Sequence, residues 1–268
     1  MPVGTVNGTR LFYETVGDGP PLLMIHGSWG DHHNWDAVAP QLAESFRVTR
    51  YDRRGHSRSV APPEQGTVHD DANDAAGLIE TVADEPAFVV GNSFGTIVAL
   101  HLACTRPELV RRLVGHEPPL VRLLDADPPA TALSAGFWER ANAVIAKLDA
   151  GDWDGGAKQF VEDIAMGPGM WEQLPGDLRR LFVDQGPTWL GEMRDPDALS
   201  IDLALLQRFD RPTLLSQGTT SPPMFSAIID RLAGTLPNAS RHTFTGAGHV
   251  PHLSHPADYV NTVRAFMR

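Results

Sequence analysis

Hydrophobic positions along the chain fall into two patterns, short continuous apolar runs and longer segments with apolar residues at helical spacing. A continuous run such as Pro21–Ile25 is typical of a parallel strand that is covered on both faces. Pro86–Val90 is a second such run, and the sequence also predicts strands, with more polar residues, at Phe46–Tyr51, Leu113–His116, Pro212–Gln217 and Ser240–Phe244. Helical spacing predicts helices at Trp35–Leu42, Val68–Val82, Thr96–Cys104, Ser226–Leu236 and Ala257–Met267. This alternation predicts an α/β fold with a doubly wound, mostly parallel sheet.

Two segments depart from the alternation. Residues Thr9–Thr15 alternate in polarity, as expected for an exposed edge strand. From Leu120 to about Leu206 the pattern is rich in helices, contains four tryptophans and includes no convincing strand. We therefore expect two units: a core formed by residues 1–119 and 207–268, and a helical cap formed by residues 120–206.

Charge and composition narrow the possible partners. The 268 residues carry a formal net charge of −11, and 42% of them are hydrophobic, which is enough for a normal core. A chain this acidic lacks the basic face that nucleic acids and anionic membranes require, so we expect neither as a partner. The N-terminal segment has none of the basic and apolar regions of a signal peptide, and no apolar run is long enough to span a bilayer. These features predict a cytoplasmic protein.

The strongest candidate chemistry lies at Gly91-Asn92-Ser93-Phe94-Gly95, between a predicted strand and a predicted helix. A serine at a sharp strand-to-helix turn requires small residues two positions before and after it, because a Cβ there would collide with neighbouring backbone. Gly91 and Gly95 meet this requirement. The turn would lift the Ser93 hydroxyl above the carboxyl edge of the sheet, as a nucleophile requires.

A serine nucleophile needs a base to remove its proton. The base in this architecture comes last in the chain. His249 follows the final predicted strand in the glycine-rich segment Thr245–His249, which can bring an imidazole over Ser93. We therefore assign the base to His249.

The base in turn needs an acid that orients it and stabilises its charged form. The commonest place for that acid is the loop after Pro212–Gln217, but this loop contains no carboxylate. Glu117 ends the preceding predicted strand, and two prolines that follow it would present it rigidly. We assign the acid to Glu117 and keep Asp202 and Asp210 as alternatives.

The oxyanion of the intermediate needs two backbone N–H groups. One should come from Phe94, directly after the nucleophile, and the other from Ser28 in the loop after His26. Gly27 would let that loop approach closely, so we include it in the oxyanion hole. We interpret His26 as a structural hydrogen-bonding residue, and we expect Trp29 at the pocket wall.

His252 and His255 are three residues apart and raise the question of a metal site. Pro251 and Pro256 prevent a regular helix there, and no carboxylate or cysteine lies close by in the sequence. We predict no metal site and no cofactor. His255 is interpreted as the start of the last helix.

These motifs together resemble the α/β-hydrolase superfamily in its capped form. The resemblance rests on His26-Gly27, Tyr51–Ser57, the turn around Ser93, and Gly248-His249, in that order along nearly the whole chain. It implies an α/β-hydrolase fold with a helical cap inserted after the sixth strand, and a triad of Ser93, His249 and Glu117.

The position of the acid resembles a minority branch that includes the fungal zearalenone lactonases. This similarity extends to His116-Glu117, to Thr219–Pro222 where an acid is usual, and to Trp189, which falls where that branch has a lid tryptophan. The chain differs from the branch at His26 and at Arg53–His56. The resemblance therefore implies the triad and hints at a lactone substrate.

We expect a serine hydrolase that cleaves a carboxylic ester or lactone of a hydrophobic small molecule through an acyl-serine intermediate. Substrate contacts are expected from Trp29, Trp189, Met166, Pro222 and Phe225, and the sequence leaves the oligomeric state open. The same triad also serves C–C bond hydrolases, for which an arginine that binds a carboxylate would be a sign, and perhydrolases. A further alternative is a ligand receptor that hydrolyses slowly.

Overall fold

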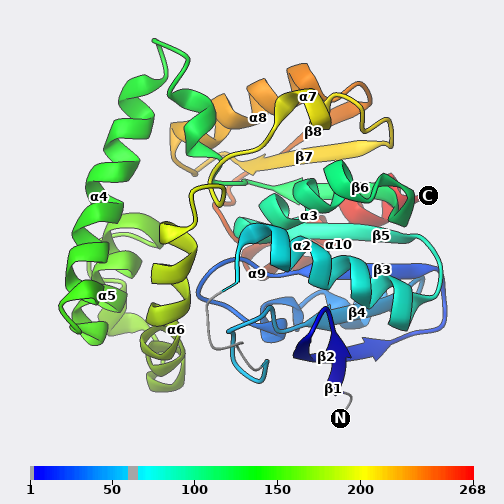
Figure 1. Ribbon diagram of the computed structural model, residues 1–268, viewed down its shortest axis with the longest axis horizontal. Helices are drawn as coiled ribbons and strands as arrows, with labels where there is room; N and C mark the ends of the chain where they lie inside the picture. Colours follow the sequence, from blue (N-terminus) through cyan, green and yellow to red (C-terminus); the bar gives the residue numbers. More distant parts are fainter. Residues whose placement is uncertain (1–2, 60–65) are drawn as a thin grey trace.

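The computed structural model describes residues 3–59 and 66–268. Eight strands form one sheet in the order β1-β2-β4-β3-β5-β6-β7-β8 (Figure 1). Only the contacts of β2 with β1 and with β4 are antiparallel, and the remaining neighbours are parallel. The strands are β1 Val3–Val6, β2 Thr9–Val16, β3 Pro21–Ile25, β4 Arg47–Tyr51, β5 Ala87–Asn92, β6 Val110–His116, β7 Thr213–Gly218 and β8 Ala239–Phe244. The doubly wound, mostly parallel sheet predicted from the sequence is confirmed.

The prediction that Thr9–Thr15 forms the edge of the sheet is wrong. Strand β1 lies outside β2 and pairs with it in antiparallel register, with Val3 opposite Phe12 and Val6 opposite Thr9. The two strands are joined at Asn7 and Gly8, whose φ angles are 47° and 75°. An Asn-Gly pair with two positive φ angles is the preferred two-residue hairpin turn, and it was the sequence signal for the missing strand.

Helices cover both faces of the sheet (Figure 1). Helices α2 (Val68–Leu78), α3 (Phe94–Thr105) and α8 (Pro223–Thr235) pack with strand residues in one hydrophobic cluster. Helices α1 (Ala39–Leu42) and α10 (Pro256–Met267) belong to a second cluster on the other face. The central strands β3 and β5 are therefore buried along their whole length, as expected for parallel strands covered on both faces, whereas most residues of the edge strand β8 are exposed or half-buried.

The predicted helix Trp35–Leu42 is not continuous. The structure has a 3₁₀ turn at His32–Trp35, followed by the single-turn helix α1 with a proline near its start. Pro40 has no N–H to donate to a carbonyl one turn earlier, so a regular helix cannot run through it from the preceding turn.

The segment after β6 forms helices beyond the carboxyl end of β7 (Figure 1). They are α4 (Thr131–Asp149), α5 (Trp153–Phe160) and α6 (Gly176–Arg194), and the short helix α7 (Leu203–Leu206) that follows them lies beside α8. Residues 120–206 contain no strand. We propose that this segment is a cap, divided from the core after residues 119 and 206, and we refer to it by that name.

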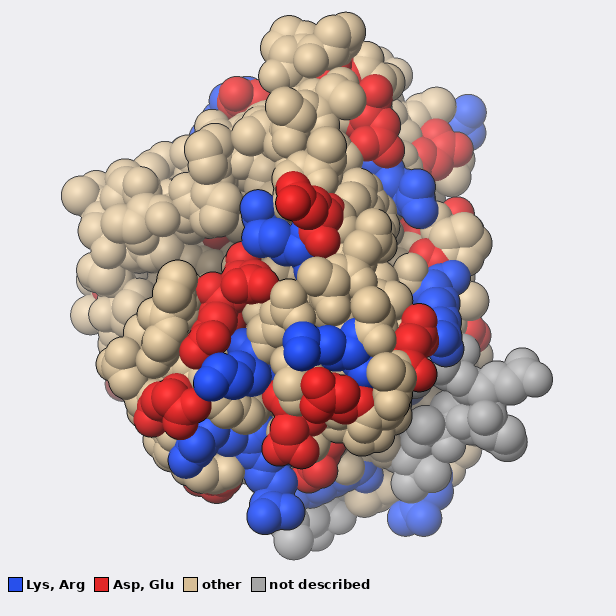
Figure 2. Space-filling view, turned by 90° about the vertical axis from the view of Figure 1, so that its left-hand side faces the viewer, with Lys and Arg blue, Asp and Glu red and all other residues tan. Residues whose placement is uncertain are grey.

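The distribution of charge on the surface and the lengths of the helices are relevant to nucleic acids and membranes as partners. On the face that carries the cap, acidic and basic side chains are intermixed, and no continuous basic area dominates the view (Figure 2). Within residues 3–59 and 66–268, no helix combines the length and the apolar character needed to cross a bilayer.

Candidate active site

Ser93 sits at the turn between β5 and α3. Its backbone has φ 56° and ψ −126°, a conformation that L-residues rarely adopt, and its N–H donates to the carbonyl of His116 over 2.8 Å. A side chain at Gly95 would collide with the carbonyl of Ile25 in the adjacent strand. Residues held in such sparsely populated backbone regions cost about 1–3 kcal/mol and cluster at functional sites. The predicted strand–turn–helix around the serine is therefore present.

The loop after β3 passes directly beside Ser93. A Cβ built on Gly27 would lie 2.9 Å from the Cβ and 3.5 Å from the Oγ of Ser93. Phe94 is the first residue of α3, so its N–H belongs to the positive end of that helix. The loop that carries Ser28 and the start of α3 thus flank the hydroxyl from two sides, as an oxyanion hole requires.

Glu117 and His249 are brought together at the same edge of the sheet. Glu117 follows β6, its side chain is fully buried, and its Oε2 lies 2.7 Å from Nδ1 of His249. Its other oxygen accepts the N–H of Gly218, at the end of β7, over 2.7 Å. A carboxylate only accepts, so His249 donates through Nδ1–H, and its Nε2 keeps a lone pair when the ring is neutral.

The surroundings of Glu117 favour its charged form. Burial alone would raise its pKa, but the hydrogen bond from His249 and the nearby imidazole of His116 outweigh burial and lower the pKa of Glu117 below its usual value. Its φ of 44° is a second rarely populated backbone conformation at this edge. An ionised, fully buried carboxylate in contact with a partly exposed imidazole can stabilise a proton on that ring.

Three further residues, which were not predicted from the sequence, hold the His249 loop in place. Asn92, next to the serine, donates its side-chain N–H to the carbonyl of His249 over 3.0 Å. Thr220 donates its hydroxyl to Ala247, and the N–H of Gly246 donates to the hydroxyl of Thr219. Both threonines belong to the loop after β7, which has no carboxylate to serve as the acid. The missing carboxylate was the only signal in the sequence that this loop positions the His249 loop instead.

The two alternative acids make other contacts. The side chain of Asp202 caps the start of α7 by accepting the N–H groups of Ala204 and Leu205. The side chain of Asp210 is 79% exposed and lies 3.7 Å from Arg211. The structure brings Glu117 to His249 and assigns Asp202 and Asp210 to these other positions.

Residues 20–256 match the family model described as the alpha/beta hydrolase fold. The chain belongs to this family. It is 34% identical over 262 residues to the pimeloyl-(acyl-carrier protein) methyl ester esterase of Chromobacterium violaceum, covering 95% of this chain and 96% of that protein. It is 29% identical over 275 residues to the 2-hydroxymuconate semialdehyde hydrolase of a Pseudomonas species, covering 97% and 91%. An alpha/beta hydrolase from Sphaerobacter thermophilus has a TM-score of 0.80 at 24% identity, with both chains fully covered.

In this α/β hydrolase, His26 has the structural role expected from the sequence. Its Nδ1 lies 2.7 Å from the carbonyl of Gly27, and its Nε2 accepts the N–H of Arg53 over 3.0 Å. Burial, together with the charge of Arg53, lowers the pKa of His26 to about 4. A neutral, fully hydrogen-bonded imidazole fixes the start of the loop that carries Ser28.

The residues expected to contact substrate fall into three groups. Trp29 and Trp189 are buried together with their ring centroids 5.5 Å apart. Pro222 and Phe225 line a hollow of about 290 Å³, and the ring of Phe225 stacks on His249 at 4.9 Å. Met166 follows a π-helical turn and is 43% exposed. The structure therefore brings Trp29 to Trp189 and Phe225 to His249, and it places Met166 at the surface.

Two places among the described residues bear on metal binding: His252 with His255, and a cluster around Asp52. His252 is buried between the rings of Trp35 and Tyr259, and His255 stands at the start of α10, as expected, without a side-chain capping bond. Ligand atoms of Asp31, His32 and Asp52 lie within 4.8 Å of one another. Asp52 there accepts two hydrogen bonds from His32 and one from Arg58, and Asp31 accepts the hydroxyl of Ser57. These bonds fold the loop after β4 onto the loop after β3.

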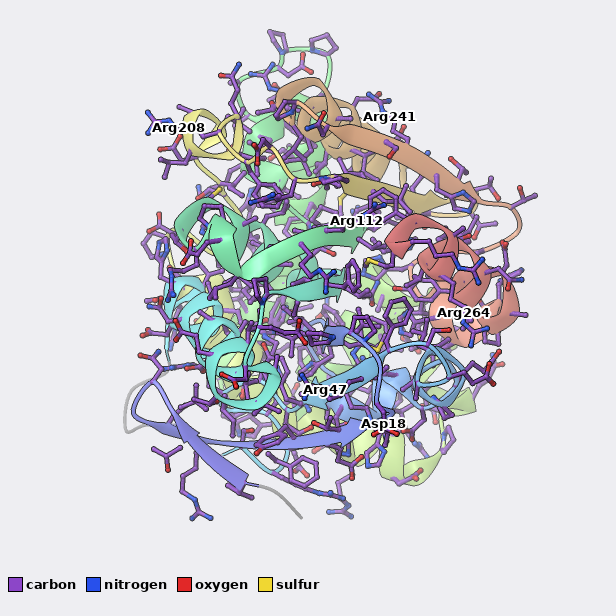
Figure 3. The ribbon with its side chains drawn as sticks, turned by 90° about the vertical axis from the view of Figure 1, so that its right-hand side faces the viewer. Asp18, Arg47, Arg112, Arg208, Arg241 and Arg264 are labelled. Atoms are coloured by element: carbon purple, nitrogen blue, oxygen red, sulfur yellow. The ribbon has the colours of Figure 1, made fainter. Side chains whose placement is uncertain are left out.

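A hollow of about 620 Å³ lies at the opposite edge of the sheet from Ser93. Its lining includes Phe88, Arg111, Arg112 and Arg264, at the amino ends of the strands and the end of α10. Figure 3 shows Arg112 and Arg264 on this side of the molecule. Arg112 donates to the carbonyl of Phe266, and Arg264 pairs with Glu44. Arg112 thus joins α10 to β6, Arg264 joins α10 to the segment after α1, and the hollow lies away from the triad residues.

Proposed function

We propose that this α/β hydrolase cleaves a carboxylic ester or lactone of a hydrophobic small molecule through an acyl-Ser93 intermediate. The observation that carries the proposal is the 2.7 Å contact between His249 Nδ1 and the buried Glu117 carboxylate, at the sheet edge where Ser93 lies. This pair supplies an oriented base, and the turn at Ser93 supplies the nucleophile.

In the first half-reaction, Ser93 Oγ attacks the carbonyl carbon while Nε2 of His249 takes the hydroxyl proton. The carbonyl π electrons move to oxygen, and the N–H groups of Phe94 and Ser28 stabilise the oxyanion. When the tetrahedral intermediate collapses, the bond to the leaving oxygen breaks and His249 gives its proton to that oxygen. Glu117 remains ionised throughout and stabilises the imidazolium.

In the second half-reaction, His249 accepts a proton from water as the water oxygen attacks the acyl carbon. Collapse of this second intermediate releases the carboxylic acid and returns the proton to Ser93 Oγ. Since the carbonyl carbon passes through the same two tetrahedral intermediates whether the leaving oxygen is cyclic or not, the triad serves esters and lactones alike.

Ester hydrolysis is also supported by the relative from Chromobacterium violaceum, which is named as a methyl ester esterase. The aromatic side chains of Trp29, Phe160 and Trp189 pack together where the cap meets the loop after β3, and an apolar cluster there would suit a substrate with an apolar body.

C–C bond hydrolysis is the second candidate, because one relative is named as a 2-hydroxymuconate semialdehyde hydrolase. Such a reaction would be favoured by an arginine available to a substrate carboxylate. The buried arginine near Phe94 is Arg53, which is already bonded to Asp71 and Glu192. Because Asp71 and Glu192 already pair with Arg53, this guanidinium is not available to a substrate carboxylate. The site therefore favours a neutral ester over an anionic substrate.

The test is a substrate panel with wild type and Ser93→Ala: short and medium aryl esters, the macrocyclic lactone zearalenone and a vinylogous diketone. We expect Ser93-dependent turnover of esters, of the lactone, or of both. Turnover of the diketone alone would select the C–C alternative, and no Ser93-dependent turnover would contradict the proposal.

A further inference from the structure

One helix of the cap contacts three consecutive residues of the loop beside Ser93. Helix α6 contributes Glu192, which accepts the hydroxyl of Ser28 over 2.5 Å. Trp189 packs against Trp29, and the side-chain amide of Gln185 donates to the carbonyl of Gly30 over 2.9 Å. Positions 185, 189 and 192 lie on one face of a helix. This face of α6 therefore contacts each of the loop residues Ser28, Trp29 and Gly30.

Glu192 also reaches the other side of the oxyanion hole. Its second oxygen accepts Nη2 of Arg53 over 2.8 Å, and both side chains are almost fully buried. The guanidinium of Arg53 in turn lies 4.4 Å from the ring centroid of Phe94. One cap carboxylate thus connects directly to Ser28 and, through Arg53, to Phe94. These are the two residues whose N–H groups are proposed to bind the oxyanion.

The loop needs such support because its conformation is unfavourable. Trp29 has φ 58°, in the left-handed region that a bulky residue rarely adopts. Its ring stacks on Phe160 at 4.6 Å and on Phe182 at 5.8 Å, and it packs against Trp189. Local strain of this kind persists only when the surroundings over-determine it. Here the surroundings are supplied by the cap.

We infer that Glu192 is a positioning residue that holds the oxyanion hole in its active geometry, so that the hole is complete only when α6 is seated on the loop. The inference rests on the function proposed above. According to this inference, the cap positions the oxyanion hole in addition to covering the substrate. Glu192 does not touch the reacting atoms; it acts through Ser28 and Arg53.

Ser28→Ala isolates this role. The variant keeps the backbone N–H that binds the oxyanion and removes only the hydroxyl that anchors it to Glu192. Loss of an oxyanion donor costs about 10²- to 10³-fold in kcat, and a displaced donor costs less. We expect kcat to fall about 10- to 100-fold. KM should change little, because the oxyanion forms only after binding.

Glu192→Ala should lower kcat in the same way, and the double variant should lose no more than the larger of the two single losses, because both remove one link. The matched control is Thr188→Val on the same helix. Thr188 donates to the carbonyl of Gly55, so the control removes a part-buried bond between cap and core that involves none of residues 28–30. It should lower thermal stability and leave kcat unchanged.

A second readout separates positioning from loss of structure. A trifluoromethyl ketone forms a tetrahedral adduct with an active serine, so its affinity should fall in Ser28→Ala by the same factor as kcat/KM. The affinity for the product acid should stay at the wild-type value.

The inference is overturned if Ser28→Ala has wild-type kcat, or if Thr188→Val loses as much kcat as Ser28→Ala. If Glu192→Ala fails to fold, Ser28→Ala and its inhibitor affinity still decide the matter. Ser93→Ala is run alongside. Activity that survives in Ser93→Ala would refute the proposed function, whereas Ser93-dependent activity with a wild-type Ser28→Ala would refute only the role of Glu192.

Discussion

Nδ1 of His249 lies 2.7 Å from Oε2 of Glu117, although 132 residues separate the two in the sequence. The contact follows from the order of the strands, because β6, β7 and β8 are parallel neighbours and their carboxyl ends meet at one edge. Glu117 follows β6 and His249 follows β8. Gly218, the last residue of the intervening strand β7, donates its N–H to the same carboxylate.

Replacing the carboxylate should disable the base without unfolding the protein. Glu117→Gln keeps the size of the side chain but removes the charge that stabilises the imidazolium and permits the wrong tautomer of His249. We expect kcat to fall on the order of 10³- to 10⁴-fold, as in other triads that lose their acid. Ester hydrolysis under saturating substrate measures it.

Asp202→Asn is the matched control, since this carboxylate caps α7 instead of contacting His249. The control should keep wild-type kcat. A large loss in Asp202→Asn together with a small one in Glu117→Gln would move the acid to Asp202.

The buried imidazole of His252 should make stability depend on pH. Burial, together with the neighbouring His116 and His249, lowers the pKa of His252 to about 3. The unfolded chain therefore takes up this proton near pH 6.5 while the folded protein does not, so stability is lost as the pH falls below about 6.5. The loss amounts to about 1.4 kcal/mol per pH unit for this one group until the folded pKa is reached.

His252→Phe tests this by removing the titrating group from a stacked aromatic site. The free energy of unfolding is measured in urea from pH 7 to pH 4 for both proteins. Below about pH 6.5 we expect the free energy of unfolding of the variant to rise relative to that of wild type by about 1.4 kcal/mol per pH unit. Parallel curves would show that His252 does not carry the dependence.

Much of the core could be predicted from the sequence because local signals and tertiary environment agree there. The apolar run Pro21–Ile25 became β3 with the predicted bounds, and the serine turn has the strand and helix that its glycines require. The acid was placed at Glu117 because the loop after β7 has no carboxylate. An acid at Glu117 must contact the imidazole of His249, and the structure has this hydrogen bond.

Other features depended on contacts between distant segments that carry no local signal. The bond from Ser28 to Glu192 spans 164 residues, and nothing near either residue indicates the other. Trp189 was expected against substrate from resemblance, but its burial among Trp29, Phe160 and Phe182 arises from the way the cap folds back on the core. Strand β1 was missed although Asn7-Gly8 indicated it, because its four residues were too short to show a pattern.

Trp189 should matter for stability, since it is buried in the aromatic contact between cap and core. Trp189→Ala leaves a large cavity and should lower the free energy of unfolding by about 3–5 kcal/mol. The comparison is Met166→Ala, whose exposed side chain should contribute less than about 0.5 kcal/mol. Denaturant unfolding measures both. Equal losses would mean that Trp189 is not part of a packed cluster.

The central claim is covalent catalysis by Ser93. The enzyme is mixed with an excess of an aryl ester, the reaction is quenched in acid within the first turnover, and the digested protein is analysed by mass spectrometry. We predict that the peptide containing Ser93 gains the mass of the acyl group, in step with a burst of released phenol, and that the pair Glu117 and His249 is needed for the adduct to turn over. Steady hydrolysis with an unmodified Ser93 peptide, or an undiminished rate in Ser93→Ala, would contradict the account.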